Sequence, residues 1–199
     1  MKNKLSMVCQ DLGLVPIKRP AADVIPPGTQ LIPEFHTDGE IRAVARGEIG
    51  GRAIIAIHHR WSINVVYGSF WIDRTIVTSP APPWPMLRMT PIKRLASMRT
   101  PPMGVRPRRG GEADVGLDHD GFRRAYRVRT DSPDFAVAML DLEAQEFLAE
   151  HPGDKWYVMP GAISIVQDGK MNEKRLRRGV ERMAGLLPLL PPELEEWID

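Results

Sequence analysis

The stretch FRRAYRVRTDSPDFAVA, residues 122–138, is the most informative for the fold, because a strand pattern changes there to a helix pattern. Successive side chains of a strand point to opposite faces, so the alternation up to Thr130 predicts a strand with two different sides. One side would hold Phe122, Arg124, Tyr126, Val128 and Thr130. The other side would hold Arg123, Ala125, Arg127 and Arg129, which makes it strongly basic.

A helix is expected to begin directly after this strand. Ser132 occupies the N-cap position, Pro133 the first helical position and Asp134 the first turn. Each of these residue types is favoured where it stands, because the cap accepts an unpaired N–H, proline needs none and an acid suits the positive helix end. The junction predicts a mixed α+β domain with an arginine-bearing strand face.

The same stretch carries a family resemblance. The pattern Phe-x-x-x-Tyr-x-Val-x-Thr-Asp-x-Pro-x-Phe-Ala, from Phe122 to Ala136, resembles an element of a group of actinobacterial proteins of unknown function. The likeness extends weakly upstream to residues 47–61 and downstream to Trp156, about two-thirds of the chain. It implies a mixed domain, which in those proteins often follows a membrane anchor that is missing from this sequence. It implies no activity, cofactor or catalytic residue.

Turn residues between β-branched runs predict a sheet made of hairpins. Gly50-Gly51 joins IRAVARGEI to RAIIAIHHRW, which is a good hairpin signal. A second hairpin is expected to join 63–67 to 71–78 around Gly68-Ser69, and a third to join 155–159 to 162–167 around Pro160-Gly161. A short strand is expected at 86–90. The first two hairpins, residues 41–78, are predicted to form a meander.

Helices are expected in the C-terminal third. Asp141 is predicted to cap a helix that runs through Leu148, and Asn172 a longer one that ends before Pro188. The long helix has an apolar face and an opposite basic face. The apolar face consists of Leu176, Val180, Met183, Ala184 and Leu187. The basic face consists of Lys174, Arg175, Arg178 and Arg182, interpreted as a solvated surface.

The predicted architecture is α+β: an antiparallel β-meander sheet from about residue 41 to 168, with helices packed on one face or end. Residues 1–40 are expected to be irregular, apart from a short helix at 4–12. Residues 41–187 form the single domain, which includes a proline-rich basic segment at 79–111 and one possible helical turn near 93–98. Residues 188–199 are expected to be an acidic tail.

Composition points to a globular protein of the reducing cytoplasm. The chain has 199 residues, 43% hydrophobic and 26% charged. No apolar run approaches the roughly 20 residues that span a bilayer. Cys9 is the only cysteine, which excludes an internal disulfide. Charge is uneven, because residues 93–109 hold six basic and no acidic residues, whereas acids outnumber bases by 14 to 7 from residue 131 onward.

Catalytic and metal-binding patterns are weak. His58 and His59 are adjacent on a predicted strand, so their side chains point to opposite faces and cannot chelate one ion together. Asp118-His119-Asp120 offers carboxylates beside an imidazole, but it fits a polar turn better than an active site. A hydrolase or metal enzyme built on these residues is therefore the third-ranked hypothesis, and no cofactor is predicted.

Two kinds of binding surface remain. Arg123, Arg127 and Arg129 could form a patch for phosphate or carboxylate groups, and a nucleic-acid-binding domain is the alternative function. Trp61, Trp71 and Trp156 are expected in the core, whereas Trp84 and Trp197 could anchor a partner or fold back over their own domain. The preferred function is a non-enzymatic protein-interaction or regulatory module with an unidentified protein partner.

Overall fold

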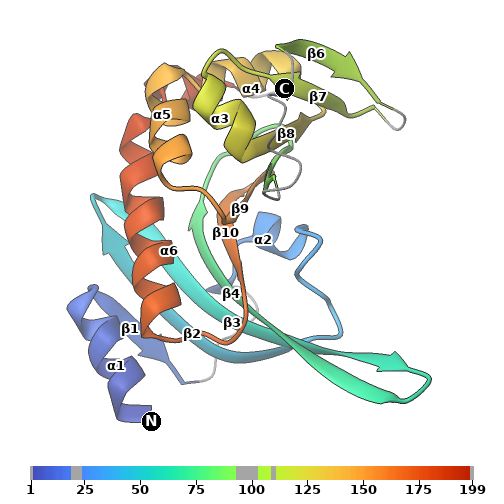
Figure 1. The fold of residues 1–199 in the computed structure, drawn as a ribbon. Coiled ribbons are helices and arrows are strands. Elements are labelled where there is room, and N and C mark those ends of the chain that lie inside the picture. Colours follow the sequence, from blue (N-terminus) through green and yellow to red (C-terminus); the bar gives the residue numbers. More distant parts are fainter. Residues whose placement is uncertain (1, 19–23, 93–102, 109–110, 198–199) are drawn as a thin grey trace.

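A computed structural model describes residues 2–18, 24–92, 103–108 and 111–197. Within these ranges ten strands form one antiparallel sheet, in the order β1-β2-β3-β4-β10-β9-β5-β8-β7-β6 (Figure 1). The strands are β1 (Leu14–Ile17), β2 (Glu40–Ile49), β3 (Arg52–Val65), β4 (Gly68–Pro80), β5 (Leu87–Pro91), β6 (Gly104–Pro107), β7 (Ala113–Gly116), β8 (Tyr126–Thr130), β9 (Lys155–Met159) and β10 (Ala162–Asp168). The predicted α+β class is confirmed.

Two helices lie near the N-terminus, three lie between β7 and β9, and one follows β10, among the described residues. They are α1 (Lys2–Asp11), α2 (Pro27–Gln30), α3 (Asp120–Ala125), α4 (Pro133–Met139), α5 (Leu142–Glu150) and α6 (Glu173–Leu186), with short 3-10 helices η2 (Leu187–Leu189) and η3 (Pro192–Glu196). Among the described residues, no helix is both long and apolar enough to cross a bilayer.

The meander of β2, β3 and β4 is interrupted in the middle of the sheet. The late hairpin of β9 and β10 inserts between β4 and β5, so that Ile165 pairs with Val77 on one side and Trp156 on the other. Strand β9 then pairs with β5 through Leu87 and Val158. A local pattern cannot predict this insertion, because the paired strands lie far apart in the sequence.

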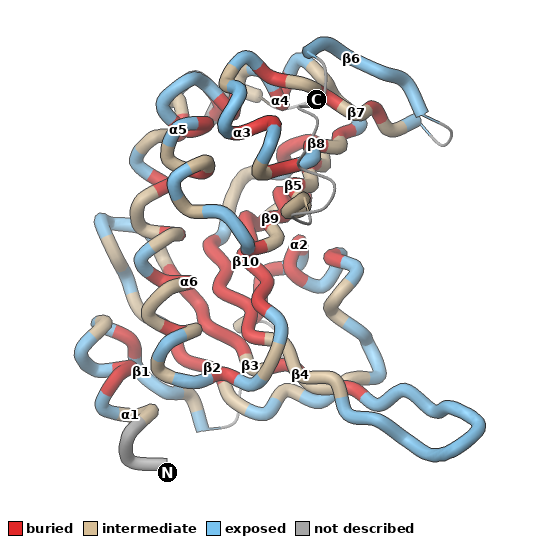
Figure 2. The backbone as a smooth tube through the Cα atoms, viewed as in Figure 1, coloured by how far each residue is buried: buried red, intermediate tan, exposed pale blue. Residues whose placement is uncertain are grey.

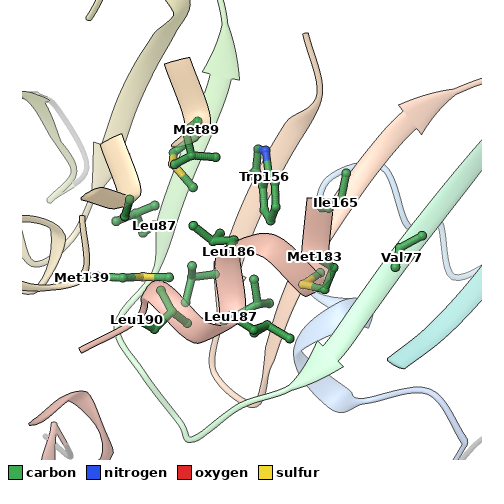
Figure 3. Packing of buried hydrophobic residues seen from close by; sticks show 14 of the residues in the cluster. Val77, Leu87, Met89, Met139, Trp156, Ile165, Met183, Leu186, Leu187 and Leu190 are labelled. Carbon is green, nitrogen blue, oxygen red and sulfur yellow. The ribbon is translucent and has the colours of Figure 1, made fainter. Parts of the chain in front are cut away.

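Both faces of the central sheet are buried, as the red strands behind α6 in Figure 2 show. The larger core lies under α6, where the fully buried side chains of Trp156, Ile165 and Met183 pack together (Figure 3). A smaller core on the opposite face contains Ile57 and Ile76, and residues 24–35 with α2 cover it. Helices α3, α4 and α5 gather at one end of α6 (Figure 1).

Most of the local signals for turns and caps are confirmed, although Ser132, at the N-cap position of α4, makes no side-chain capping hydrogen bond. Gly50 and Gly51 both have positive φ, 59° and 78°, in the two-residue turn between β2 and β3. Asp141 caps α5 by accepting from the backbone N–H of Ala144 at 2.9 Å. Asn172 caps α6 in the same way by accepting from the N–H of Arg175 at 3.0 Å. The strand expected at 86–90 is β5, shifted by one residue.

The strand predicted from Phe122 was too long. Residues 120–125 form helix α3, and strand β8 begins only at Tyr126. His119 caps this helix, since its Nδ1 accepts from the N–H of Phe122 at 3.1 Å. Phe122 and Tyr126 stack with ring centroids 5.6 Å apart. Residues four apart lie on one face of a strand and also on one face of a helix, so the spacing of Phe122 and Tyr126 fits both structures.

The two ends of the chain pack onto the same sheet. Strand β1 pairs with β2, and Cys9 of α1 is buried against the larger core. At the other end Leu190 and Leu194 are buried in that core. The possible helical turn near 93–98 lies outside the described residues, as do residues 93–102 and 109–110 of the proline-rich basic segment.

Candidate interaction surfaces

The hairpin of β3 and β4 extends beyond the rest of the sheet, at the lower right of Figure 1. Strand β2 stops pairing with β3 at Arg60, and β10 stops pairing with β4 at Arg74. Residues 61–72 consequently pair as strand residues only with each other, from Trp61 with Ile72 on to Val65 with Gly68. In this part of the hairpin neither outer edge has a partner strand among the described residues.

The end of this hairpin is exposed and apolar. Tyr67 is 96% and Val66 92% exposed, and Phe70 and Trp71 are each 61% exposed. Ile63 lies opposite Phe70 on one face, which is continuous with Val65 at the turn. We call residues 62–72 the hairpin tip. It is the largest cluster of exposed large hydrophobic side chains among the described residues.

The hairpin tip carries nothing that protects an exposed edge. Its sequence, SINVVYGSFWI, contains no charged residue and no proline. Natural sheets normally protect free edges with lysine, proline, bulges or very short strands, because unpaired N–H and C=O groups attract other strands. The hairpin tip therefore has the properties of a surface that another molecule covers.

The base of the hairpin is held rigidly by aromatic stacking. The rings of Trp61 and His36 stack at 4.3 Å, and the guanidinium of Arg74 lies 5.2 Å from the Trp61 ring. His59 stacks on Phe35 at 4.5 Å, and its Nε2 donates to the His36 carbonyl at 3.0 Å. Burial lowers the pKa of His59, so its ring is neutral at pH 7.

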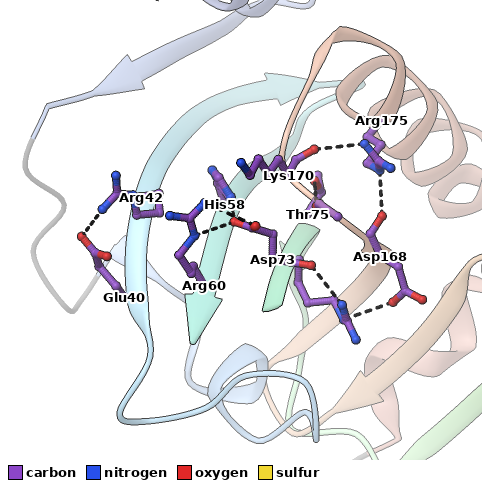
Figure 4. Close-up of polar contacts among 11 residues, drawn as sticks. Glu40, Arg42, His58, Arg60, Asp73, Thr75, Asp168, Lys170 and Arg175 are labelled. Carbon is purple, nitrogen blue, oxygen red and sulfur yellow. Dashed lines mark hydrogen bonds and ion pairs between the residues drawn. The ribbon is translucent and has the colours of Figure 1, made fainter. Parts of the chain in front are cut away.

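A second set of contacts fixes the opposite face of the base. Asp73 accepts from His58 Nε2 at 2.7 Å and from Arg60 Nε at 2.8 Å (Figure 4). Burial raises the pKa of Asp73, but the hydrogen bonds from Arg60 and His58 outweigh it and hold the pKa below its usual range. Arg60 also lies 5.6 Å from the ring of Trp71. The network thus connects the rigid base to an exposed aromatic ring.

Arginines line the exposed face at the other end of the sheet. Arg88 of β5, Arg129 of β8 and Arg106 of β6 share one row with Asp114 of β7. Arg129 is 3.3 Å from Asp114, which also pairs with Arg108 at 2.8 Å. Arg127 lies on the same face of β8 and is exposed, while Tyr126 and Val128 are buried on the other face, as predicted.

Arg123 does not belong to this face. It lies on α3, is 8% exposed, and donates to the carbonyl of Asp118 at 2.9 Å and to the Asp120 carboxylate. The expectation that it lies on the same strand face as Arg127 and Arg129 was wrong, because its segment is helical, although Arg123 and Arg127 both border a small cavity of about 100 Å³. Its role is to close the Asp118–Asp120 turn.

The five tryptophans match the expectations in part. Trp84 is 2% exposed and its Nε1 donates to the Leu194 carbonyl at 2.7 Å, so it folds back on its own domain. Trp197 is half-buried and lies 5.8 Å from Phe135, which also contacts Trp84. Trp61 and Trp156 are core residues as expected. The expectation that Trp71 is a core residue was wrong. Trp71 is 61% exposed, because it lies in the part of the hairpin that extends beyond the neighbouring strands.

The histidines have structural contacts. His58 and His59 point to opposite faces of β3, and His119 caps α3. Among the described residues, no three histidine, cysteine or acidic side chains are close enough to hold a metal ion.

Sequence reasoning missed the hairpin tip. It placed the turn at Gly68-Ser69, whereas the turn residues are Val66 and Tyr67. The available signal was the absence of charge from residues 62–72. One face of the hairpin tip carries the polar Ser62, Asn64 and Ser69, but the other carries Ile63, Val65 and Phe70, which no other part of the described chain covers.

The comparisons with known proteins concern the fold. No protein-family model and no curated protein matches the sequence. One solved structure that is similar is the crystal structure of the mycobacterial trehalose monomycolate transport factor A, TtfA. It has a TM-score of 0.59 and 14% sequence identity, and the match covers 96% of each chain. The likeness shows the fold alone, and it agrees with the actinobacterial resemblance at that level.

Proposed function

We propose that this protein is a non-enzymatic protein-interaction module whose contact element is the hairpin tip. The observation that carries the proposal is the set of exposed apolar side chains on the hairpin tip: Ile63, Val65 and Phe70 on one face, Trp71 on the other, and Val66 and Tyr67 at the turn. Exposed apolar patches of this kind mark interaction sites, and tyrosine and tryptophan are enriched among the residues that dominate binding energy.

The partner is proposed to be a protein rather than a lipid bilayer. Residues 61–72 have backbone N–H and C=O groups along both outer edges that no described strand pairs. Such groups cost several kcal/mol each in hydrocarbon, so deep insertion of the hairpin into lipid is unfavourable. A partner protein can satisfy them with a strand of its own while its apolar side chains cover Phe70 and Ile63.

The rigid base supports this role. Trp61 is held between His36 and Arg74, and Arg60 positions the ring of Trp71. A contact element that is already ordered loses less conformational entropy on binding. The name of the structurally similar protein, a transport factor, is compatible with a fold that works through contacts with other molecules.

Affinity capture from host lysate with paired variants tests the proposal. The double variant Phe70→Ser/Trp71→Ser removes two aromatic rings from the hairpin tip. The control, Val15→Ser/Leu31→Ser, removes apolar side chains that are 68% and 60% exposed elsewhere. A specific protein that survives nuclease, is retained by the control and is lost with the double variant supports the proposal. Equal recovery by both variants contradicts it.

Nucleic-acid binding is a second candidate, favoured by the arginine row on the open sheet face. Arg106 and Arg127 have no ion-pair partner among the described residues, whereas Arg108 and Arg129 share Asp114. Recovery of nucleic acid that falls with salt and with Arg106→Ala/Arg127→Ala would favour this function. The hairpin variants would then leave binding unchanged.

A further inference from the structure

Residues 31–39 connect α2 to β2 and pack against the base of the hairpin (Figure 1). We call them the 31–39 segment. The ring of His59 stacks on Phe35 of this segment at 4.5 Å and donates from Nε2 to the His36 carbonyl at 3.0 Å. The same carbonyl accepts from the backbone N–H of Gly39 at 2.9 Å. One carbonyl oxygen therefore joins the ring of His59 to the turn at the end of the segment.

The surroundings of His59 suit only the neutral ring. Its side chain is 0% exposed, and its Nδ1 has no hydrogen-bond partner among the described residues. With Nε2 as the donor, Nδ1 of the neutral ring is an acceptor. Protonation turns Nδ1 into a charged donor that nothing accepts from, and a buried charge without a partner is far more costly than a neutral polar atom. The closed arrangement therefore excludes the charged form of the ring.

The ring cannot reach water while the 31–39 segment stays in place. A Cβ at Gly39 would lie 2.3 Å from Nε2 of His59, so the glycine backbone packs directly against the imidazole. Phe35 covers one face of the ring, and the ring of Trp61 lies 5.5 Å away. Solvation of a charged imidazole therefore requires the segment to move.

The charges around His59 do not compensate for its protonation. Burial lowers the pKa of His59, and the charges of His36 and His58 lower it further, whereas the hydrogen bond to the His36 carbonyl and the charge of Asp38 offset this only in part. Arg74 lies opposite His59 in the register of β3 with β4 and adds a cation nearby. The other carboxylates of the neighbouring elements already have partners: Glu34 pairs with Lys155, Glu40 with Arg42, Asp73 with His58 and Arg60, and Asp168 with Arg74.

Trp61 connects the 31–39 segment to the hairpin tip. Its ring stacks on His36 at 4.3 Å and is 7% exposed. Trp61 also pairs with Ile72 in the first residue pair of the projecting part of the hairpin. Movement of the segment would uncover Trp61 and remove one side of the support at the base of the hairpin tip.

We propose that the 31–39 segment is a pH-sensitive cover: protonation of His59 in weakly acidic solution releases it from the hairpin base and loosens the hairpin tip. In the open form the imidazole has its ordinary pKa of about 6.5, so the closed form is favoured above this pH and is lost as the pH falls below it. The equilibrium constant for opening should rise by up to about thirtyfold between pH 7.5 and pH 5. That acid would also weaken partner binding rests on the proposed function of the hairpin tip.

Amide hydrogen exchange of the full chain, followed by NMR at pH 7.5 and pH 5, tests the inference without a partner. The N–H groups of Phe35 and Gly39, which donate to the carbonyls of Ile32 and His36, report opening of the segment. The N–H of Thr29, which donates to the Pro26 carbonyl at 2.9 Å, is the control. After correction for the intrinsic effect of pH, exchange should rise up to about thirtyfold at the two reporters, less across residues 62–72, and not at the control.

Three variants assign the effect to its residue. His59→Phe keeps a ring on Phe35 and should abolish the pH dependence of exchange. His36→Phe keeps a ring on Trp61 and should retain it. Gly39→Ala places a methyl group against the imidazole and should open the segment already at pH 7.5.

Three results would overturn the inference: equal protection of the Phe35 and Gly39 amides at both pH values, no protection of either at pH 7.5, or a full pH response in His59→Phe. Because no partner takes part, such a failure is distinct from a failure of the proposed function, which the capture experiment decides.

Discussion

The two halves of strand β3 both carry β-branched apolar residues, but these residues are buried in the first half and exposed in the second. Ile54 and Ile57 are fully buried, while Ile63 and Val65 are 43% and 46% exposed. Both halves are rich in β-branched residues and form regular strand, as expected from their propensity. The difference comes from what lies beside them: β2, β4 and both cores enclose the first half, and only the opposite strand of the hairpin accompanies the second. Local sequence therefore predicts the strand, whereas topology decides whether its apolar face is covered.

The largest expected effect concerns the covered half. Ile57→Ala should lower the free energy of unfolding by about 2–5 kcal/mol, because it removes a buried side chain from a packed core and leaves a cavity. Urea denaturation followed by circular dichroism measures the change. A loss below about 1 kcal/mol would mean that this half of β3 is not enclosed as described.

A second effect is expected at the point where the two halves meet. Asp73→Asn should destabilise the protein by about 1–3 kcal/mol at neutral pH, since it weakens charge-assisted hydrogen bonds from His58 and Arg60. The pKa of Asp73 is lowered in the folded state, so its stabilising contribution exists above the unfolded pKa and is lost as the pH falls through the folded value. The unfolding free energies of the two proteins should therefore converge below about pH 4. Parallel curves down to pH 2 would contradict this.

His59 gives a pH effect of the same sign in a higher pH range. Burial lowers its pKa, so below about pH 6.5 the unfolded chain takes up a proton that the folded ring resists. Stability should fall as the pH decreases from about 6.5 to 5. His59→Phe keeps a ring to stack on Phe35 and removes this titration. Its melting temperature should depend less on pH over that range than that of the natural sequence, and an equal dependence would show that His59 is not the group responsible.

The smallest effect on stability is expected in the projecting half. Ile63→Ala should change the free energy of unfolding by no more than about 0.5 kcal/mol, because the side chain contacts little beyond its own hairpin. The same variant should reduce capture of the partner protein. If Ile63→Ala is as destabilising as Ile57→Ala, the hairpin tip is packed against another part of the chain and the comparison fails.

The sequence predicted those elements whose signals are local. Gly50-Gly51 and Pro160-Gly161 were identified because particular backbone angles require such residues, and Asp141 and Asn172 because helix ends need an acceptor. Phe122 was misassigned because its spacing to Tyr126 satisfies both a strand and a helical turn. The remaining errors depend on long-range packing. Trp84 is buried by residues near the C-terminus. Trp71 lies in the part of β4 that extends beyond its neighbour β10. Neither fact is encoded near the residue itself.

The central claim is that the hairpin tip contacts another protein, and site-specific photo-crosslinking in the host cell tests it most directly. A photoreactive phenylalanine analogue is placed at Tyr67 and, as the control, at Val137, which is 55% exposed on α4. We predict one discrete protein adduct from position 67 and none from position 137. The absence of an adduct at position 67, or the same adduct from both positions, would contradict the account.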